Sequence, residues 1–351
     1  MNGGNINMII NISTSEFKRA FKLIESIWKN GIDKPVFQLV TEDKTIKLYG
    51  KFRNIIELTL YGEVKEEGTL FLELAYIAQI SEEKGIVTIL QAGNNIEIIG
   101  ECFKLTIEQD EHEDISPCMS KSEANSISFN AIFNNDDMED IGRMKNIIHK
   151  NGGKAFLSEK GVTLLGEFFS FEAPIIVQNL KHNLKIDYSF LKLMSVLSKF
   201  TPSCGIGTTQ KFGNTFIFIR TNDDFFYLET EPIDGAVVKG VEGGTVVVSP
   251  KELAKAVSSH EMSNFIKIDT KENSKDIVLT SSFGKGKKET SISVDSTYLG
   301  NGSIILNIKY LLTILKALSY NKNIKIHYDS DLIELIGENG LRGVLGGVKG
   351  V

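Results

Sequence analysis

The sequence has few of the residues that metal centres and disulfide frameworks need. Its 351 residues include three cysteines (102, 118 and 204) and five histidines (112, 149, 182, 260 and 327). An odd number of widely separated cysteines favours reduced thiols in a cytoplasm over a set of disulfides. The histidines show no metal-ligand spacing with each other or with cysteine, so we expect no bound metal and no cofactor.

Long apolar runs are also missing. The sequence contains no stretch of about 18 apolar residues, so it predicts no membrane span. The first residues, MNGGNINMII, lack a basic segment followed by a long apolar one, and we therefore expect no secretory signal and a cytoplasmic location. The formal net charge of −6 is mild and argues against a uniformly basic protein built to coat nucleic acid.

Recognisable catalytic motifs are absent as well. The segment FGKGKKE (283–289) contains glycine and lysine but not the spacing of a phosphate-binding loop, so an exposed hairpin tip is the better interpretation. The acidic cluster DDMED (136–140) falls where a helix should begin, and acids there favour the positive end of the helix dipole. No pairing of nucleophile with base is evident, and we expect no enzymatic activity.

One short pattern occurs three times, about 117 residues apart: LFLELAYIAQI (70–80), LKIDYSFLKLM (184–194) and ILNIKYLLTIL (305–315). Each begins with alternating apolar and polar residues, as a strand does, and continues with apolar residues spaced three or four apart, as a helix does. Asp187 and Asn307 are good helix N-caps, whereas Glu73 is a poorer one. Each copy therefore predicts a strand that runs directly into a short amphipathic helix.

Each copy is preceded by another strand-to-helix unit and followed by short strands with hairpin turns. Ser13 and Ser249 are the expected caps of two of the preceding helices; in the middle copy the cap is either Asn130 or Asn134. Each third of the chain thus predicts two β-α-β-β-β halves. A repeat of this length is a domain, and we expect an α+β protein with domains 1–118, 119–240 and 241–351. The predicted helices are 14–30, 74–84, 134–151, 188–200, 250–262 and 308–322.

Positive charge concentrates on the predicted helices. These six segments hold 15 Lys/Arg and 10 Asp/Glu, whereas the rest of the chain has a net charge of −11. Several lysines recur four or seven residues apart, which places them on one helix face. A solvated surface would explain one such helix, but several helices with this bias in an acidic protein indicate a shared role.

This combination of repeat number, repeat length and element order resembles the bacterial DNA polymerase III beta subunits, the sliding clamps. The similarity covers nearly the whole chain and includes LNIKYLLTILKAL (306–318), KPVFQLVTEDKTIKLYG (34–50) and CFKLTI (102–107). It implies a head-to-tail homodimer that forms a six-domain ring around duplex DNA, with sheets outside and helices inside. A divergent member encoded by a phage, a plasmid or a low-GC bacterium would fit the abundance of Ile, Asn and Lys.

The resemblance implies three sets of site residues. Sequence-independent contacts to double-stranded DNA would come from Lys18, Lys22, Arg143, Lys192, Lys199, Lys255, Lys309 and Lys316. The dimer interface would include Phe103, Leu105, Ile292 and Val294. A pocket for short peptides of a DNA polymerase and a clamp loader would include Leu165, Phe169, Phe171, Asn307, Tyr310, Leu345 and Val348, of which Asn307 and Tyr310 match the family's Asn-x-x-Tyr.

Two segments depart from the family pattern. LLGEFFSFEAP (164–174) stands where the family has Thr-Asp-Gly-His-Arg-Leu, and LGGVKGV (345–351) replaces its Met-Pro-Met-Arg-Leu ending. Both segments help to form the peptide pocket in the family, so ring formation is better supported than the usual partner specificity. A clamp-fold scaffold that binds proteins but is not loaded on DNA is the alternative, and an enzyme with a site between domains is a third hypothesis.

Overall fold

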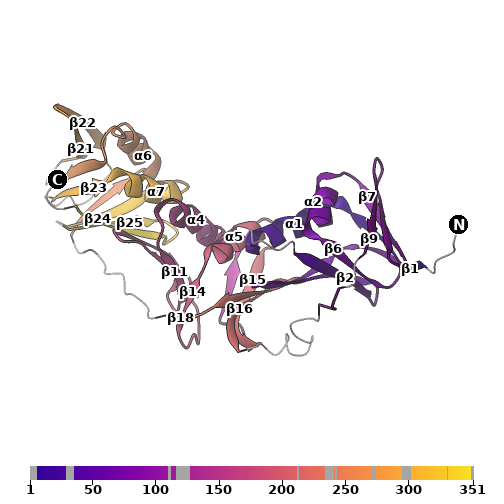
Figure 1. Ribbon diagram of the computed structural model, residues 1–351. Helices are drawn as coiled ribbons and strands as arrows, with labels where there is room; N and C mark the ends of the chain where they lie inside the picture. The colour runs from indigo at the N-terminus through magenta and orange to yellow at the C-terminus, as the bar shows by residue number, and fades with distance from the viewer. Residues whose placement is uncertain are drawn as a thin grey trace. The chain divides into compact units, whose positions relative to one another are not determined.

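The computed structural model describes residues 6–28, 35–109, 112–115, 127–211, 213–233, 241, 243–270, 274–294, 302–329 and 331–348. These residues form the predicted α+β fold, with six helices and four antiparallel sheets (Figure 1). They belong to two compact units: unit 1 comprises residues 1–138 and 192–231, and unit 2 comprises 139–191 and 232–351. Among the described helices, none is both long and apolar enough to cross a membrane.

Unit 1 contains a five-stranded and an eight-stranded sheet. The five-stranded sheet has the order β5 (Gly62–Glu66), β1 (Ile6–Ser13), β7 (Ile86–Ala92), β8 (Asn95–Ile99) and β9 (Lys104–Glu108). The eight-stranded sheet has the order β10 (Ala131–Asn134), β15 (Ser203–Lys211), β16 (Asn214–Arg220), β17 (Phe225–Thr230), β4 (Ile55–Leu60), β3 (Thr45–Lys51), β2 (Val36–Glu42) and β6 (Thr69–Glu73).

Unit 2 contains a nine-stranded and a four-stranded sheet. The nine-stranded sheet has the order β18 (Pro232–Ile233), β14 (Asn183–Ile186), β11 (Lys154–Ser158), β12 (Gly161–Leu165), β13 (Phe169–Pro174), β26 (Arg342–Gly346), β25 (Leu332–Gly337), β24 (Ile324–Tyr328) and β19 (Gly244–Val248). The four-stranded sheet has the order β22 (Gly286–Ser293), β21 (Asp276–Phe283), β20 (Phe265–Thr270) and β23 (Gly302–Asn307).

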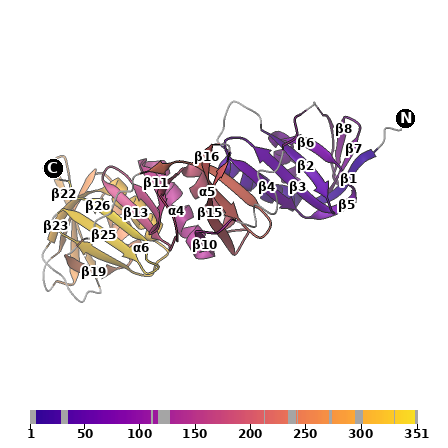
Figure 2. The same ribbon diagram turned by 90° about the horizontal axis from the view of Figure 1, so that it is seen from below.

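Both large sheets combine strands from two predicted domains. In unit 1, β4 pairs with β17 although about 170 residues separate them in sequence, and in unit 2, β13 pairs with β26 (Figure 2). We call these two pairings the closed junctions. Because the sheets run through the predicted boundaries, the two units do not coincide with the three predicted domains, and the three-domain division remains a prediction.

The helices begin where the caps predict. They are α1 (Thr14–Ile27), α2 (Leu74–Glu82), α4 (Asn135–Asn151), α5 (Tyr188–Leu197), α6 (Pro250–Ser258) and α7 (Ile308–Leu318). The side chains of Ser13, Ser249 and Asn307 each accept a hydrogen bond from an amide of the first turn, whereas Glu73 makes no such bond. At α4 the open choice resolves to Asn134, whose Oδ1 accepts from the Asp137 amide at 2.9 Å.

Helix ends fall short of the predicted ones by up to four residues. The segments after α5, α6 and α7 form turns in which Phe200, His260 and Asn321 donate their amides to carbonyls three residues earlier. Their apolar residues continue the helical spacing, which is why the pattern alone extended the helices. Within the units, α1 packs beside α2 and α6 beside α7 (Figure 1).

A buried ion pair secures the closed junction of unit 1. Arg19 on α1 donates to the Asp224 carboxylate at 2.6 Å and also to the carbonyl of Thr59 on β4. Asp224, which lies in the turn between β16 and β17, accepts from the Thr59 amide at 3.0 Å. Burial acts to lower the pKa of Arg19, but the charges of Asp224 and Glu16 outweigh it and the pKa is raised. The arginine therefore stays charged and joins a helix, a strand and a turn.

A different arginine secures the closed junction of unit 2. Arg342, the first residue of β26, donates to Glu172 on the neighbouring β13 at 3.0 Å and also to Glu334 on β25. Glu334 is only 7% exposed, so this partner offsets the cost of burying its carboxylate. The arginine here lies within the sheet and links three adjacent strands.

Candidate functional sites

The predicted DNA-contact residues of unit 1 lie on or next to helices. Lys18 and Lys22 are exposed one turn apart on α1, and the Lys22 ammonium lies 6.0 Å from the centre of the Phe200 ring. Lys192 on α5 donates to the carbonyl of Glu25 at 2.9 Å. Lys199 is exposed but follows the end of α5, so it belongs to a turn instead of the predicted helix.

In unit 2, lysines line an open, polar hollow. Lys309 and Lys316 on α7 are exposed and contribute to a hollow of about 430 Å³, together with Lys150 near the end of α4. Lys150 was not among the contacts predicted from the sequence, although Arg143 on the same helix was. Lys255 is exposed on α6 and does not line this hollow. Glu261 is the one acidic residue among the described residues that line the hollow, so three lysines outweigh it, and the net positive lining suits an anionic ligand such as a phosphate backbone.

Arg143 is already engaged by neighbouring side chains. It forms salt bridges with Glu139 at 2.8 Å and Asp140 at 2.5 Å, and its guanidinium lies 3.4 Å from the centre of the Tyr320 ring. Asp140 also accepts from the Tyr320 hydroxyl at 2.8 Å. Burial raises the pKa of Asp140 in spite of these partners. Two carboxylates and a ring thus compete with any phosphate for Arg143, which makes it the weakest member of the predicted set.

The predicted peptide pocket contains an aromatic cluster. The ring of Tyr310, half-buried on α7, lies 5.5 Å from the Phe169 ring and 6.4 Å from the Phe168 ring. Phe168 is 50% exposed, and it was not among the pocket residues predicted from the sequence. Such a partly exposed group of rings is the kind of surface that anchors an apolar peptide side chain.

The other predicted pocket residues divide between surface and core. Leu165 and Val348 are half-buried, and Leu345 is buried opposite Phe169 in the β13–β26 ladder. Phe171 is fully buried, so a bound peptide could not contact it in this conformation. Asn307 caps α7 by accepting from the Lys309 amide at 3.0 Å, and it also lines the basic hollow.

The predicted dimer residues lie on the edge strands of the two smaller sheets or next to them. Phe103 and Leu105 are half-buried at β9, the last strand of the five-stranded sheet. Ile292 and Val294, at β22, are buried within unit 2. Among the described strands, β9 pairs only with β8, and β22 pairs only with β21. Each therefore offers one free row of backbone donors and acceptors.

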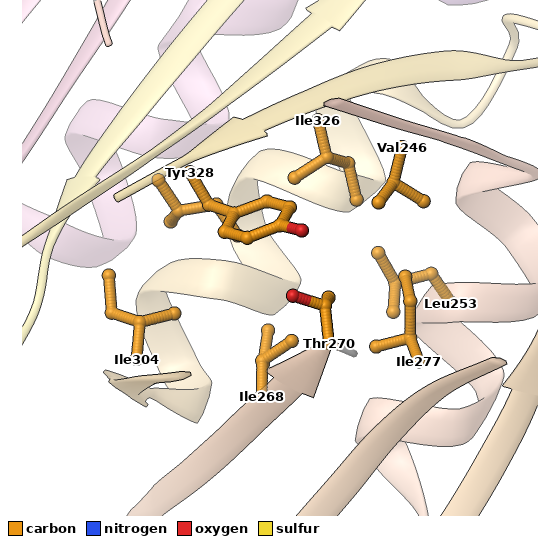
Figure 3. A pocket seen from close by; sticks show the side chains of 9 residues that line it. Val246, Leu253, Ile268, Thr270, Ile277, Ile304, Ile326 and Tyr328 are labelled. Atoms are coloured by element: carbon orange, nitrogen blue, oxygen red, sulfur yellow. The ribbon is translucent and has the colours of Figure 1, made fainter. Parts of the chain in front are cut away.

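Neither the interior nor the surface of the described residues offers an obvious catalytic site. A cavity of about 10 Å³ lies between the two sheets of unit 2, and Thr270 and Tyr328 line it together with mostly aliphatic side chains (Figure 3). It has room for about one water molecule. The described residues include no group of three or more His, Cys, Asp or Glu side chains that could hold a metal ion.

Comparison with solved structures shows that this architecture is the fold of DNA sliding clamps. The matched structures include two beta subunits of DNA polymerase and one DNA polymerase sliding clamp, from three bacteria. The chain matches the Streptococcus pyogenes protein with a TM-score of 0.76 and 16% identity, over 97% of this chain and 100% of that one. It matches the Thermotoga maritima and Bacillus subtilis proteins with TM-scores of 0.75 and identities of 15% and 14%, over 98% of this chain and 100% of each.

The likeness is one of fold. A scan against protein-family models found no match, and no curated protein matched the sequence. The chain nevertheless shares the sliding-clamp fold along almost its entire length, as its three-fold sequence pattern predicted.

Proposed function

We propose that this protein is a DNA sliding clamp, a processivity factor without catalytic activity of its own. Two copies would close head to tail into a ring of six domains around duplex DNA. The observation that carries the proposal is the strand order of the four sheets. The eight-stranded sheet, read from β6 to β10, has the same order of strands as the nine-stranded sheet read from β14 to β19. Each strand of one sheet corresponds to a strand at the same place in the repeat in the other.

The two smaller sheets supply the halves of a third such sheet. The half β23-β20-β21-β22 corresponds to β6-β2-β3-β4, and the half β9-β8-β7-β1 corresponds to β17-β16-β15-β10. Joining β22 to β9 would therefore complete the same order a third time. The two open edges would also be covered, which removes a liability for uncontrolled association. The likeness to sliding clamps favours a second copy of the chain as the source of the missing half.

Contact with DNA would be electrostatic and independent of sequence. The proposed contact residues are Lys18, Lys22, Lys150, Lys192, Lys199, Lys255, Lys309 and Lys316, with Arg143 as a minor contributor. Lysines on separate helices can meet phosphates without reading bases. A ring also explains how a protein of net charge −6 can hold DNA, because only its helices need to be positive.

Light scattering and DNA binding test the two parts of this proposal. Size-exclusion chromatography with light scattering should give a mass near twice 38.9 kDa. Binding to a closed circular duplex should weaken with salt, and each lysine replaced by glutamine should lower the slope of log K against log [salt] by about one unit. The same loss should occur on any DNA sequence. A stable monomer that does not bind DNA would favour the clamp-fold scaffold instead.

Partner peptides of a polymerase and a clamp loader would bind at the cluster of Phe168, Phe169 and Tyr310. Tyr310→Ala should weaken a cognate peptide by more than about 1 kcal/mol, because truncated aromatic anchors commonly cost that much. Tyr76→Ala is the matched control, since Tyr76 occupies the same position in the first repeat. Equal losses in both variants, or none in either, would place the peptide elsewhere. Because both pocket segments depart from the family pattern, a generic bacterial clamp-binding peptide should bind more weakly than a cognate one.

A further inference from the structure

The three repeats share one ladder register, which can be traced outward from the helix caps. In each first half, the residue two positions before the cap of α2, α5 or α7 starts a path of directly paired residues across three more strands. Every path ends on a glutamate. The paths are Phe71, Gln38, Tyr49 and Glu57; Lys185, Phe156, Thr163 and Glu172; and Ile305, Lys267, Thr280 and Glu289.

The second halves follow the same rule. Here the paths start two residues before the caps of α4, α6 and α1, and again cross three more strands. They are Ile132, Gly205, Arg220 and Phe225; Val247, Lys325, Ile336 and Arg342; and Asn11, Thr88, Ile99 and Lys104. Phe225, Arg342 and Lys104 are thus equivalent positions.

Both closed junctions join the two paths at their ends. Glu57 pairs with Phe225 in unit 1, and Glu172 pairs with Arg342 in unit 2. The remaining ends are Glu289 on β22 and Lys104 on β9, both on open edges. We propose that in the head-to-tail dimer Lys104 of one copy lies directly opposite Glu289 of the other. This inference rests on the dimer proposed above and adds the register and the residues that set it.

The side chains at the open edge match those of the closed junction in unit 2. There, Arg342 lies between Glu334 and Glu172. Lys104 already has the equivalent of the first carboxylate, because its ammonium lies 2.8 Å from Glu97, which occupies the position of Glu334. Glu289 occupies the position of Glu172 and would complete the arrangement from the second copy.

The side chains of the closed junction in unit 2 are less exposed than their equivalents at the open edges. The side chains of Arg342 and Glu172 are 22% and 21% exposed, whereas those of Lys104 and Glu289 are 55% and 56% exposed. In the single chain the Glu289 carboxylate lies 3.3 Å from the ammonium of Lys287 on its own strand. Pairing would cover both groups and place opposite charges directly across the ladder, where such pairs stabilise a sheet.

The inferred register also places Leu105 opposite Lys288 and Thr106 opposite Lys287. The resemblance to the clamp family implies instead that Phe103 and Leu105 meet the strand near Ile292 and Val294. Lys288 and Ile292 are four residues apart on β22, a distance of about 13 Å along an extended strand. The two alternatives are therefore distinguishable by cross-linking, since a disulfide needs Cα atoms within about 7 Å.

Charge reversal tests the pair in the full-length protein. Lys104→Glu and Glu289→Lys should each raise the dimer dissociation constant by roughly tenfold, because the ring would contain two copies of the pair and each would become repulsive. The double variant should return to within about threefold of the wild type. Lys65→Glu, on the opposite edge strand of the same sheet, is the control and should leave the dimer unchanged.

Cysteine cross-linking tests the register in a chain with Cys102→Ser and Cys118→Ser, with buried Cys204 retained. Leu105→Cys combined with Lys288→Cys should give covalent dimers on oxidation, whereas Leu105→Cys combined with Ile292→Cys should not. A cross-link only in the second pair, or a double charge variant no better than the singles, would overturn the register while leaving a wild-type dimer intact. A monomeric wild type, or cross-links confined to single chains, would overturn the dimer itself.

Discussion

The two closed junctions share a register but rely on different chemistry. In unit 1 the ladder position holds Phe225, and the decisive cation is Arg19, which reaches in from a helix to Asp224 in a turn. In unit 2 the ladder position holds Arg342 itself, fixed between two glutamates of the same sheet. Backbone pairing therefore sets the geometry of both closed junctions. An ion pair stabilises each of them, and its cation comes from a helix in unit 1 and from the sheet itself in unit 2.

The difference has a consequence for where each junction is vulnerable. The ion pair of unit 1 joins three separate elements, and Asp224 is only 6% exposed on its side chain. The arrangement in unit 2 is confined to three neighbouring strands and is partly open to water. Water screens exposed charges, so we expect unit 1 to depend more strongly on the Arg19–Asp224 pair than unit 2 depends on Arg342.

The largest expected effect follows from removing the acid in unit 1. Asp224→Ala would remove the nearer of the two carboxylates that pair with Arg19, together with the acceptor of the Thr59 amide, and breaking such a buried pair typically costs about 3 kcal/mol. Urea unfolding should show this loss in the free energy of unfolding. Asp223→Ala, next to it and exposed, is the control and should cost less than about 1 kcal/mol. Equal effects would mean that the turn, and not the ion pair, holds the junction.

A smaller effect is expected from the equivalent change in unit 2. Arg342→Met keeps much of the side-chain volume but leaves the buried Glu334 unpaired, at a cost of about 2 kcal/mol. Arg342→Lys should recover part of the loss, because it restores the charge without the forked geometry. If the methionine variant is as stable as the wild type, the ladder alone suffices in unit 2 and the comparison with unit 1 becomes sharper.

The smallest effect is expected beside the open edge. Buried His260 contacts Ser281 Oγ at 2.7 Å and, on β22, Thr290 Oγ1 at 3.0 Å. Burial lowers the pKa of His260, with Lys288 adding to the effect. An unfolded histidine has a pKa of about 6.5, so between that value and the lower folded pKa the unfolded chain binds more protons. Stability should thus be fully present above about pH 6.5 and fall as the pH drops through the folded pKa.

Thermal unfolding from pH 7.5 downward measures this trend. The melting temperature of the wild type should decrease more than that of His260→Gln, which cannot gain the proton. An identical pH dependence in both proteins would show that His260 titrates alike in the folded and unfolded chains.

The sequence predicted the local elements well because their signals are local. Ser13, Ser249 and Asn307 marked helix starts correctly, and FGKGKKE forms the predicted hairpin, with its turn at Gly284 in the left-handed region. Pairing between distant strands has no such signal. No residue pattern in β4 indicates that it pairs with β17, so the spacing of apolar and polar residues could not predict the continuous sheets.

The candidate sites were predictable in part for the same reason. Tyr310 and Asn307 follow from a short motif, but Phe168 became a candidate only when the fold brought its ring near Tyr310. Phe171 could not be recognised as core from its spacing, because it lies two residues from Phe169 and therefore on the same face of β13. Similarly, the charge of Arg143 suggested a phosphate contact, while its engagement with Tyr320 depends on an interaction nearly 180 residues away in sequence.

The glutamate that ends each first-half path also matters while the chain is being made. β4 leaves the ribosome about 165 residues before β17. Because synthesis adds about 5–20 residues per second, the edge of β4 stays unpaired for roughly 10–30 s. β13 waits similarly for β26, and in the proposed dimer β22 waits for a second chain. During that interval Glu57, Glu172 or Glu289 holds a charge near the middle of the bare edge. A charge there hinders premature pairing with another nascent strand, so one repeated residue protects each sheet until its own partner arrives.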